Sequence, residues 1–396
     1  MNRWTRWSST ALCLAASATA TATAQTCTLQ SQTVDLPLVS KATPKFAYQV
    51  RVQLGSDADG RSNGSQVLEV DTGSTGVVVP LSDALRSAWD ASSTPGYIFY
   101  SSDGKYHPGK YVDVPMRLGI SADGKRAAAR VDRITVLAAQ CTCDVASVAQ
   151  PPKPLAQVPA TCAGYNGSPA LSSTTQVLRD CSTIAPGFGM MGVGYDRGVD
   201  AARNPFLNLA QMRAQRMSPG YIVGAKGITL GVSKQALTGF ALVPLQRGAA
   251  TATAPSDWQA PTACASFPGS GSDYRVCGKL LPDTGVSYMM LNPVVPPATP
   301  ASLQQTVQLA GHATRVVPDA TQLRLDVVDA RGQPVFGYGF AVGDGKAATP
   351  DSVQWRGPLK TPPAHINSGR HLLAAGDYAY DAVCGHAGFR AVSPAP

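Results

Sequence analysis

Apolar and polar residues alternate in several short stretches, and each of these stretches predicts a β-strand. Residues 46–55 alternate in this way and end at a glycine, which is typical of a half-buried strand. Residues 97–100 and 110–114 flank a stretch rich in Gly, Asp and Pro, so they predict a β-hairpin with an exposed tip. Residues 130–139 predict a further strand. The first third of the chain is therefore predicted to consist of consecutive strands joined by turns.

Two stretches depart from this pattern. The segment that begins at Asn204 predicts the one helix, because a proline follows at the first helical position, and residues 218–220 (Ser-Pro-Gly) end it. Residues 141–181 are rich in Pro and Ser and lack periodicity, so we interpret them as a surface excursion tied by disulfides.

One three-residue motif occurs twice, each time between two apolar runs. The copies are Asp71-Thr72-Gly73 and Asp283-Thr284-Gly285. In both, a hydroxyl residue follows four positions after the aspartate (Thr75 and Ser287), and three apolar residues follow at positions six to eight. The matched flanks indicate an internal duplication.

The N-terminus predicts a secretory signal. Arg3 and Arg6 precede a small and apolar stretch, residues 10–20, and Ala22-Thr23-Ala24 provides a cleavage site, so the signal is expected to end at residue 24. No later segment approaches the roughly 20 apolar residues of a membrane span. We expect an exported protein, periplasmic or extracellular.

The eight cysteines beyond the signal are an even number, which favours disulfides in an oxidising compartment. Cys264 and Cys277 flank a Gly/Ser-rich loop and are the simplest pair to propose; Cys27 and Cys384 would then be left to each other. The connectivity of the four cysteines within residues 141–181 stays open. The cysteines lack the spacing of zinc ligands, and the five histidines show no H-E-x-x-H pattern. We therefore expect no metal or cofactor.

Length and charge narrow the possible functions. With 396 residues, 44% of them hydrophobic, the chain is long enough for two or three domains. The net charge of +8 comes from scattered basic residues without a stripe, so no nucleic-acid partner is predicted. A G-x-S-x-G match at 60–64 and a G-x-G-x-x-G match at 187–192 both lack the preceding strand that their functions require.

The D-T-G-[ST]-[ST] motif after an apolar strand, repeated once per half, resembles the signature of the pepsin-like aspartic endopeptidases. The resemblance spans about residues 45–392 and implies a mostly β, bilobal fold, with two lobes related by a pseudo-two-fold and the active site in the cleft between them. We expect an N-terminal lobe at 25–223 and a C-terminal lobe at 224–396. The resemblance also implies a second motif, two apolar residues and a glycine that thread behind each Asp-Thr-Gly turn. Its two copies are expected at 189–195 and at 371–377.

The resemblance implies that Asp71 and Asp283 activate one water between them. Two carboxylates held close together cannot both ionise, so they share a proton and provide a base and an acid in one site, as in the aspartic proteases themselves. Tyr100 is the predicted flap residue over the substrate, with Tyr106 as second choice. A peptide or protein substrate, and a monomer, are expected.

The residues next to the two aspartates are implied to support them. The threonines hydrogen-bond across the lobe interface, the glycines allow tight turns, and Ser74 contacts the outer oxygen of Asp71. The supporting set is Thr72, Gly73, Ser74, Thr284, Gly285 and Ser287.

Three positions depart from the family pattern. Val286 replaces a hydroxyl beside the second aspartate, Pro282 directly precedes that aspartate, and Val78 replaces a tryptophan behind the flap. These departures weaken the second half-site. The alternative hypothesis is therefore a pepsin-fold protein that binds peptides or partner proteins with little or no turnover. A third hypothesis is an extracellular protease inhibitor or cell-wall binding protein with the same fold.

Overall fold

The structure is a computed structural model. It describes residues 27–40, 43, 47–59, 64–100, 102–147, 157–168, 176–196, 200–249, 257–271, 273–295, 297–309 and 312–392. The predicted signal, residues 1–24, lies outside this part of the chain, as do 148–156 and 169–175 of the predicted excursion. None of the helices in the described part has the length and apolar character that a bilayer crossing needs.

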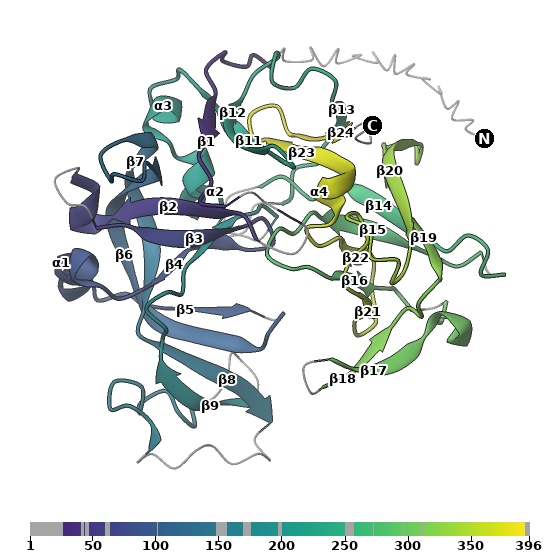
Figure 1. The fold of residues 1–396 in the computed structure, drawn as a ribbon, viewed down its shortest axis with the longest axis horizontal. Helices are drawn as coiled ribbons and strands as arrows, with labels where there is room; N and C mark the ends of the chain where they lie inside the picture. Colours follow the sequence, from purple (N-terminus) through teal and green to yellow (C-terminus); the bar gives the residue numbers. More distant parts are fainter. Residues whose placement is uncertain are drawn as a thin grey trace, which may run out of the picture.

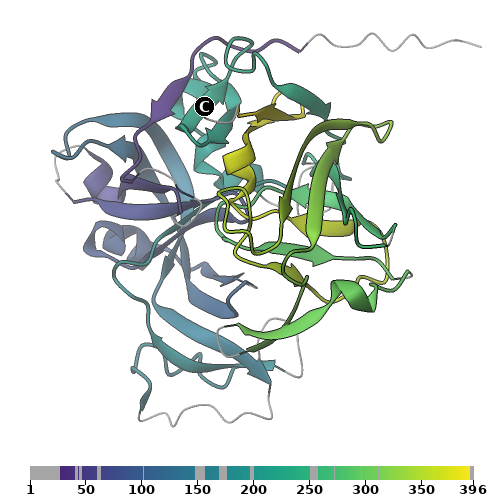
Figure 2. The same cartoon turned by 45° about the vertical axis from the view of Figure 1, so that its right-hand side comes forward.

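The fold is mostly β and has two halves, as the sequence predicted. Figure 1 shows the first half in purple to teal and the second in green to yellow, with a third sheet between them at one end. Figure 2, turned by 45°, shows the same division. Each half has a nine-stranded sheet, and the third sheet has six strands.

The sheet of the first half closes on itself. Its order is β2-β3-β10-β4-β7-β6, and β6 also pairs with β2, which encloses an apolar core. Strand β5 pairs with β6, and β8 and β9 extend the sheet beyond β6. The strands are β2 (Gln49–Leu54), β3 (Gln66–Asp71), β4 (Thr75–Pro80), β5 (Pro95–Tyr100), β6 (Lys105–Ile120), β7 (Ala127–Ala139), β8 (Cys141–Ser147), β9 (Gln176–Thr183) and β10 (Met190–Val193).

The sheet of the second half is open and has the order β17-β18-β21-β16-β22-β15-β14-β19-β20. Its strands are β14 (Thr262–Ser266), β15 (Arg275–Leu281), β16 (Met289–Asn292), β17 (Gln305–Leu309), β18 (His312–Val316), β19 (Gln322–Val328), β20 (Pro334–Ala341), β21 (Val353–Trp355) and β22 (Ala364–Asn367).

Strand pairing confirms the internal duplication. In the first half, β10 lies between β3 and β4, parallel to β3 and antiparallel to β4. In the second half, β22 lies in the same way between β15 and β16. The strand after each turn, β4 or β16, also pairs in parallel with β7 or β21. Each half therefore builds one four-stranded unit around its Asp-Thr-Gly turn.

The glycine motif behind the first turn is confirmed. Met191 pairs with both Val70 and Val77, and a Cβ on Gly192 would lie 2.5 Å from the backbone nitrogen of Thr75. Only a glycine lets β10 approach the turn this closely.

The second copy of this motif is not at residues 371–377, so that prediction was wrong. Those residues form α4 (Leu372–Ala375) and the start of the next strand. The threaded strand is β22, and Gly369 follows it beside the second turn, where a Cβ would lie 2.5 Å from the Tyr288 carbonyl oxygen. The pattern was misleading because a buried helical turn with Leu372 and Leu373 has the same apolar-apolar-glycine spacing, whereas the true motif carries polar Asn367 and Ser368.

The third sheet contains strands from both ends of the chain, in the order β1-β12-β11-β23-β24-β13. The predicted boundary at Gly224 falls at the last residue of one of its strands, β11. Across it, the Tyr195 and Tyr380 rings stack at 3.9 Å between centroids. The strands are β1 (Val34–Leu36), β11 (Ser218–Gly224), β12 (Gly227–Val232), β13 (Ala241–Pro244), β23 (Gly376–Asp381) and β24 (His386–Ala391).

The helices differ from the sequence prediction. The segment from Asn204 is not one helix: α2 (Asp200–Arg203) is followed by a 3₁₀ turn, Pro205–Leu207, and by α3 (Ala210–Arg213). Asn204 is buried and its amide donates to the Val193 carbonyl at 2.7 Å, so contact with β10 fixes a turn where local propensity favours a helix.

The described chain also contains a helix that the sequence did not reveal, α1 (Asp83–Ala91). It buries only Leu85 and Trp89, one turn apart, which is too little apolar periodicity to recognise. Short 3₁₀ segments, Gly55–Asp59 and Ala301–Leu303, complete the helical content described.

All eight cysteines beyond the predicted signal are paired. Cys264–Cys277 and Cys27–Cys384 are the pairs that the sequence suggested. Within the excursion, Cys141 bonds Cys162 and Cys143 bonds Cys181.

Candidate active site between the two halves

The two Asp-Thr-Gly turns meet where the halves join. Asp71 ends β3 and Asp283 follows β15, and their exposed fractions are 5% and 6%. Each turn packs against the aspartate of the other: a Cβ on Gly73 would overlap the Asp283 carboxylate, and one on Gly285 would lie 2.6 Å from Oδ1 of Asp71. The two glycines are therefore needed because the carboxylates are so close together.

The two threonines hold the turns together with a nearly symmetric set of hydrogen bonds. The Thr72 backbone N–H donates to Oγ1 of Thr284 at 3.0 Å, and the Thr284 N–H donates to Oγ1 of Thr72 at 3.0 Å. Each hydroxyl then donates to a carbonyl of the opposite half, Thr284 to Val70 at 2.6 Å and Thr72 to Pro282. These bonds fix the relative position of the two aspartates.

The surroundings of the dyad favour one shared proton. The Gly73 N–H donates to Oδ1 of Asp71 at 2.6 Å, and the Gly285 N–H donates to Oδ1 of Asp283 at 2.8 Å. Burial, and next the negative charge of Asp71, raise the pKa of the Asp283 carboxyl well above its usual range. A protonated Asp283 beside Asp71 is the pattern in which one carboxyl serves as acid and the other as base.

Pro282 leaves the junction intact. It lies just after β15 and lacks an N–H, whereas the corresponding Val70 donates to the Tyr48 carbonyl at 2.8 Å. The bond across the junction uses only the Pro282 carbonyl, which accepts from the Thr72 hydroxyl. The proline removes a donor that this contact does not need.

Asn367 is a site residue that the sequence analysis missed. Its side-chain amide donates to Oδ2 of Asp283 at 2.5 Å. Asn367 ends β22, and it is buried. No sequence signal pointed to it, since an apolar pair was expected at this place in the threaded strand.

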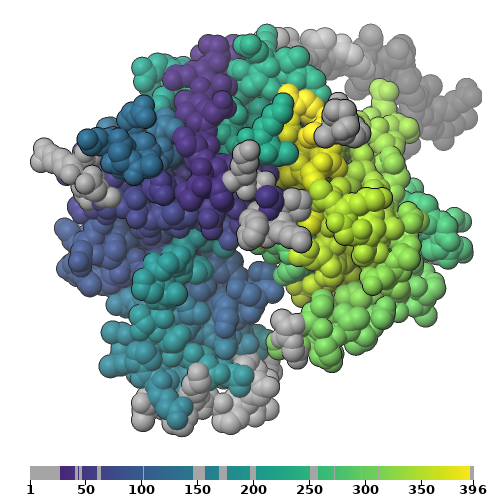
Figure 3. Space-filling view, in the orientation of Figure 1, coloured from purple at the N-terminus to yellow at the C-terminus, as the bar shows by residue number. Residues whose placement is uncertain are grey.

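A cleft of about 740 Å³ opens above the dyad. Both halves line it, and Figure 3 shows the hollow between the purple-to-teal and the green-to-yellow parts of the surface. Most residues of the predicted site line it: Asp71, Gly73, Ser74, Tyr100, Asp283, Gly285 and Ser287. Thr72 and Thr284 lie buried in the junction beneath.

Tyr100 and Ser74 face each other in the cleft. Burial, and next the charge of Asp71, raise the pKa of Tyr100 well above its usual range. Neither hydroxyl completes a hydrogen bond within the described residues, so the predicted contact of Ser74 with Asp71 is not formed. Tyr106 lies outside the cleft lining and stacks on Tyr97 at 5.1 Å between centroids.

The hairpin β5–β6, the predicted flap, forms part of the cleft wall, because Ile98, Tyr100 and Asp103 line the cleft. Val78 is buried beneath it, in a cluster that Ile98 and Phe188 also join. At the tip, the Ser102 carbonyl accepts a hydrogen bond from the Tyr288 hydroxyl at 3.2 Å. Tyr288 follows the second turn, so the flap touches the opposite half.

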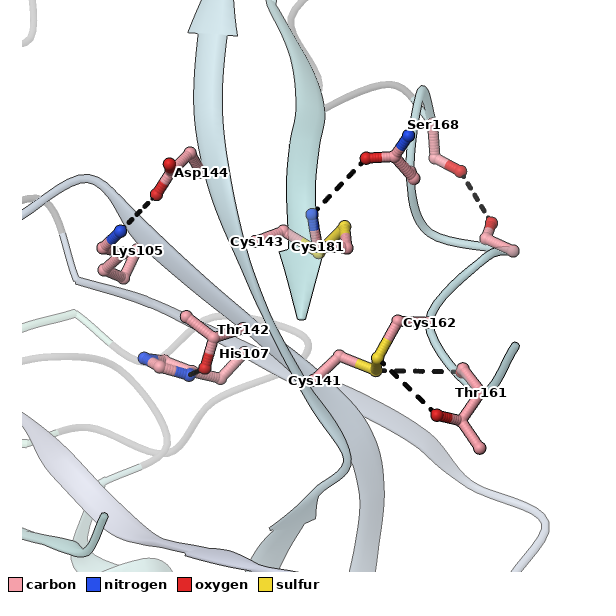
Figure 4. The surroundings of a disulfide bond; sticks show 12 residues. Lys105, His107, Cys141, Thr142, Cys143, Asp144, Thr161, Cys162, Ser168 and Cys181 are labelled. Carbon is pink, nitrogen blue, oxygen red and sulfur yellow. Dashed lines mark hydrogen bonds and ion pairs between the residues drawn. A yellow bond between two sulfur atoms is a disulfide. The ribbon is translucent and has the colours of Figure 1, made fainter. Parts of the chain in front are cut away.

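The disulfide-tied excursion braces the outer strand of the flap (Figure 4). Strand β8 pairs with β6 at Lys105–Asp144 and Tyr106–Cys143, and the Lys105 ammonium and the Asp144 carboxylate form an ion pair. The His107 ring contacts the Thr142 hydroxyl at 3.0 Å. The excursion and the flap therefore form one continuous sheet.

One group of metal-binding side-chain types occurs in the described part of the chain: Asp381, Cys384 and His386. The Cys384 sulfur is bonded to Cys27, so it offers no thiolate to a metal. The described cleft lining contains no such group.

Comparison with known proteins gives a likeness in structure only. No family model and no curated protein matches the chain. Among solved structures, an aspartic proteinase from Irpex lacteus aligns with a TM-score of 0.49 and 13% identity, over 91% of this chain and 97% of that chain. The chemistry of the site must therefore be judged from this chain's own residues.

Proposed function

We propose that the chain is an aspartic-type endopeptidase that hydrolyses peptide bonds with a water activated by Asp71 and Asp283. The observation that supports this most is the meeting of two buried carboxylates at the floor of an open cleft, with one pKa raised partly by the charge of the other.

The reaction uses both protonation states. The ionised carboxyl takes a proton from water as the water oxygen bonds to the peptide carbonyl carbon, and the protonated carboxyl gives its proton to the carbonyl oxygen. When the C–N bond breaks, the carboxyl that took the water proton gives it to the leaving nitrogen, and the other carboxylate takes a proton from one hydroxyl of the diol. A carboxylic acid and an amine are released, and the dyad again holds one proton. Tyr100 covers the substrate from the flap.

We further propose that the protein works as an exported monomer, in the periplasm or outside the cell. Four disulfides support the exported location, because such bonds persist in oxidising compartments.

The test is cleavage of a denatured protein by the purified chain from acidic to neutral pH. We expect Asp71→Asn and Asp283→Asn each to lower kcat/KM at least about 100-fold, while circular dichroism shows a folded chain. Activity that persists unchanged in both variants contradicts the proposal.

The alternative is a protein that binds peptides without cleaving them. The Ser74 hydroxyl favours it, because it makes no hydrogen bond to Asp71 within the described structure. Binding of peptides by a wild-type chain that cleaves none of them would support this alternative.

A further inference from the structure

The cleft contains a third carboxylate in its first-half wall, Glu69. Glu69 and Asp71 are separated by one residue on β3, so their side chains lie on the same face of the strand, and both line the cleft. In the second half, the position two residues before Asp283 is Leu281, which also lines the cleft. The two walls therefore differ in charge at equivalent positions.

The Glu69 carboxylate makes no hydrogen bond and no ion pair with the described residues. Burial raises the pKa of this half-buried carboxyl to about 7; the charge of Arg370 opposes that shift, and the charge of Asp71 adds to it. Burying a carboxylate without a partner is unfavourable. A cation that entered the cleft would relieve this cost.

Apolar groups beside Glu69 suit the aliphatic part of a long basic side chain. Met190 of β10 is the neighbour of Glu69 of β3 in the sheet, and it lines the cleft. Ile98 of the flap also lines the cleft. The Tyr100 hydroxyl lies within reach of the charge of Glu69, which contributes to raising the pKa of Tyr100. Lys and Arg combine an apolar stem with a charged head, so they match a wall of this kind.

Arg370 does not fill this place. It comes from the second half, and its guanidinium donates to the Gly285 carbonyl at 3.5 Å. Its positive charge favours the ionised form of Glu69, yet the two make no ion pair.

We propose that Glu69 is a specificity-determining residue of the cleft, which receives the cationic side chain of a Lys or Arg adjoining the scissile bond on the Asp71 side. The inference rests on the proposed endopeptidase function and names a class of substrate for it.

The test compares quenched fluorescent peptides that carry Lys, Arg, norleucine or Glu at each position around one scissile bond. We expect wild-type kcat/KM to be at least about tenfold higher for Lys or Arg than for norleucine at one flanking position. Glu69→Gln should bring the ratio of kcat/KM for the Lys peptide to kcat/KM for the norleucine peptide close to one. Asp90→Asn, an exposed acid on α1, is the matched control and should keep the preference.

A second measurement separates failure of this inference from failure of the proposed function. Binding of uncleavable Lys and norleucine peptides is followed by fluorescence anisotropy, with wild type and Glu69→Gln. If no peptide is cleaved but Lys binding is preferred and depends on Glu69, the endopeptidase fails and the basic subsite stands. Equal binding of both peptides, or a Lys preference that survives Glu69→Gln, overturns the subsite.

Discussion

Asp71 and Asp283 have nearly the same sequence around them but different partners. Asn367 donates a side-chain hydrogen bond to Asp283, whereas Asp71 accepts a hydrogen bond from the backbone N–H of Gly73. The hydrogen bond from Asn367 opposes the rise in the pKa of Asp283 that burial and Asp71 cause. The dyad is therefore asymmetric through its environment.

The raised pKa of Asp283 predicts how stability varies with pH. The folded chain holds the Asp283 proton to higher pH than the unfolded chain, so this contribution is present in acid and is lost as pH rises above about 4. Between acidic and neutral pH, the free energy of unfolding should fall in both proteins. We expect the fall in Asp283→Asn to be smaller than in the wild type by at least about 1 kcal/mol.

Urea unfolding across this pH range measures the effect. Glu69 also has a raised pKa and contributes with the same sign in both proteins, so the difference between their slopes reports on Asp283. Equal slopes in wild type and variant would contradict the prediction.

Among the secondary-structure elements, the flap depends on the excursion next to it. Strand β6 is shared between the hairpin and the extension by β8 and β9, and the Val145 N–H donates to the Gly104 carbonyl at 3.1 Å near the tip. The disulfide Cys143–Cys181 ties β8 to β9. Support for the flap therefore comes from a segment that is distant from the dyad in sequence.

Removing this disulfide should loosen the flap. In Cys143→Ser/Cys181→Ser, a loop of 38 residues is no longer closed, so we expect a loss of about 3–4 kcal/mol in the free energy of unfolding. We also expect faster hydrogen exchange of the flap amides at 104–107.

The matched control is Cys264→Ser/Cys277→Ser, which opens a loop of 13 residues in β14–β15 of the second half. Its free energy of unfolding should fall by about 3 kcal/mol, and hydrogen exchange of the flap amides should stay unchanged. If both pairs of substitutions accelerated hydrogen exchange in the flap equally, the claim that the Cys143–Cys181 disulfide supports the flap would be refuted.

At the scale of the whole molecule, two of the connections between the halves are a sheet and a hydrogen-bonded junction. One is the six-stranded sheet, which combines β1, β11, β12 and β13 with β23 and β24 from the end of the chain. The other is the threonine junction beneath the dyad. The sheet positions the halves, and the threonines set the distance between the two carboxylates.

Thr284→Val should lower the stability of the folded chain. The substitution leaves the Val70 carbonyl and the Thr72 N–H without their partner in a buried place, which costs about 1–3 kcal/mol for each group. We expect a lower urea midpoint for unfolding. Thr262→Val, an exposed position on β14, is the control and should change the midpoint little.

Local patterns were sufficient for much of the fold. The strands around residues 50, 70 and 135, the flap hairpin and the two equivalent turns were predictable because alternation and the Asp-Thr-Gly triplet act over short stretches. The helix predicted from Asn204 does not form, since a buried hydrogen bond from the Asn204 side-chain amide to the Val193 carbonyl overrides the local helix propensity.

The sequence by itself determined the duplication, its two aspartates and the glycines that let the turns approach each other. Tertiary structure alone decided that Asn367 meets Asp283 and that Cys143 pairs with Cys181. The reason is physical: a partner 84 residues away from Asp283 is selected by the register of β22 against β15 and β16, and no local pattern encodes that register.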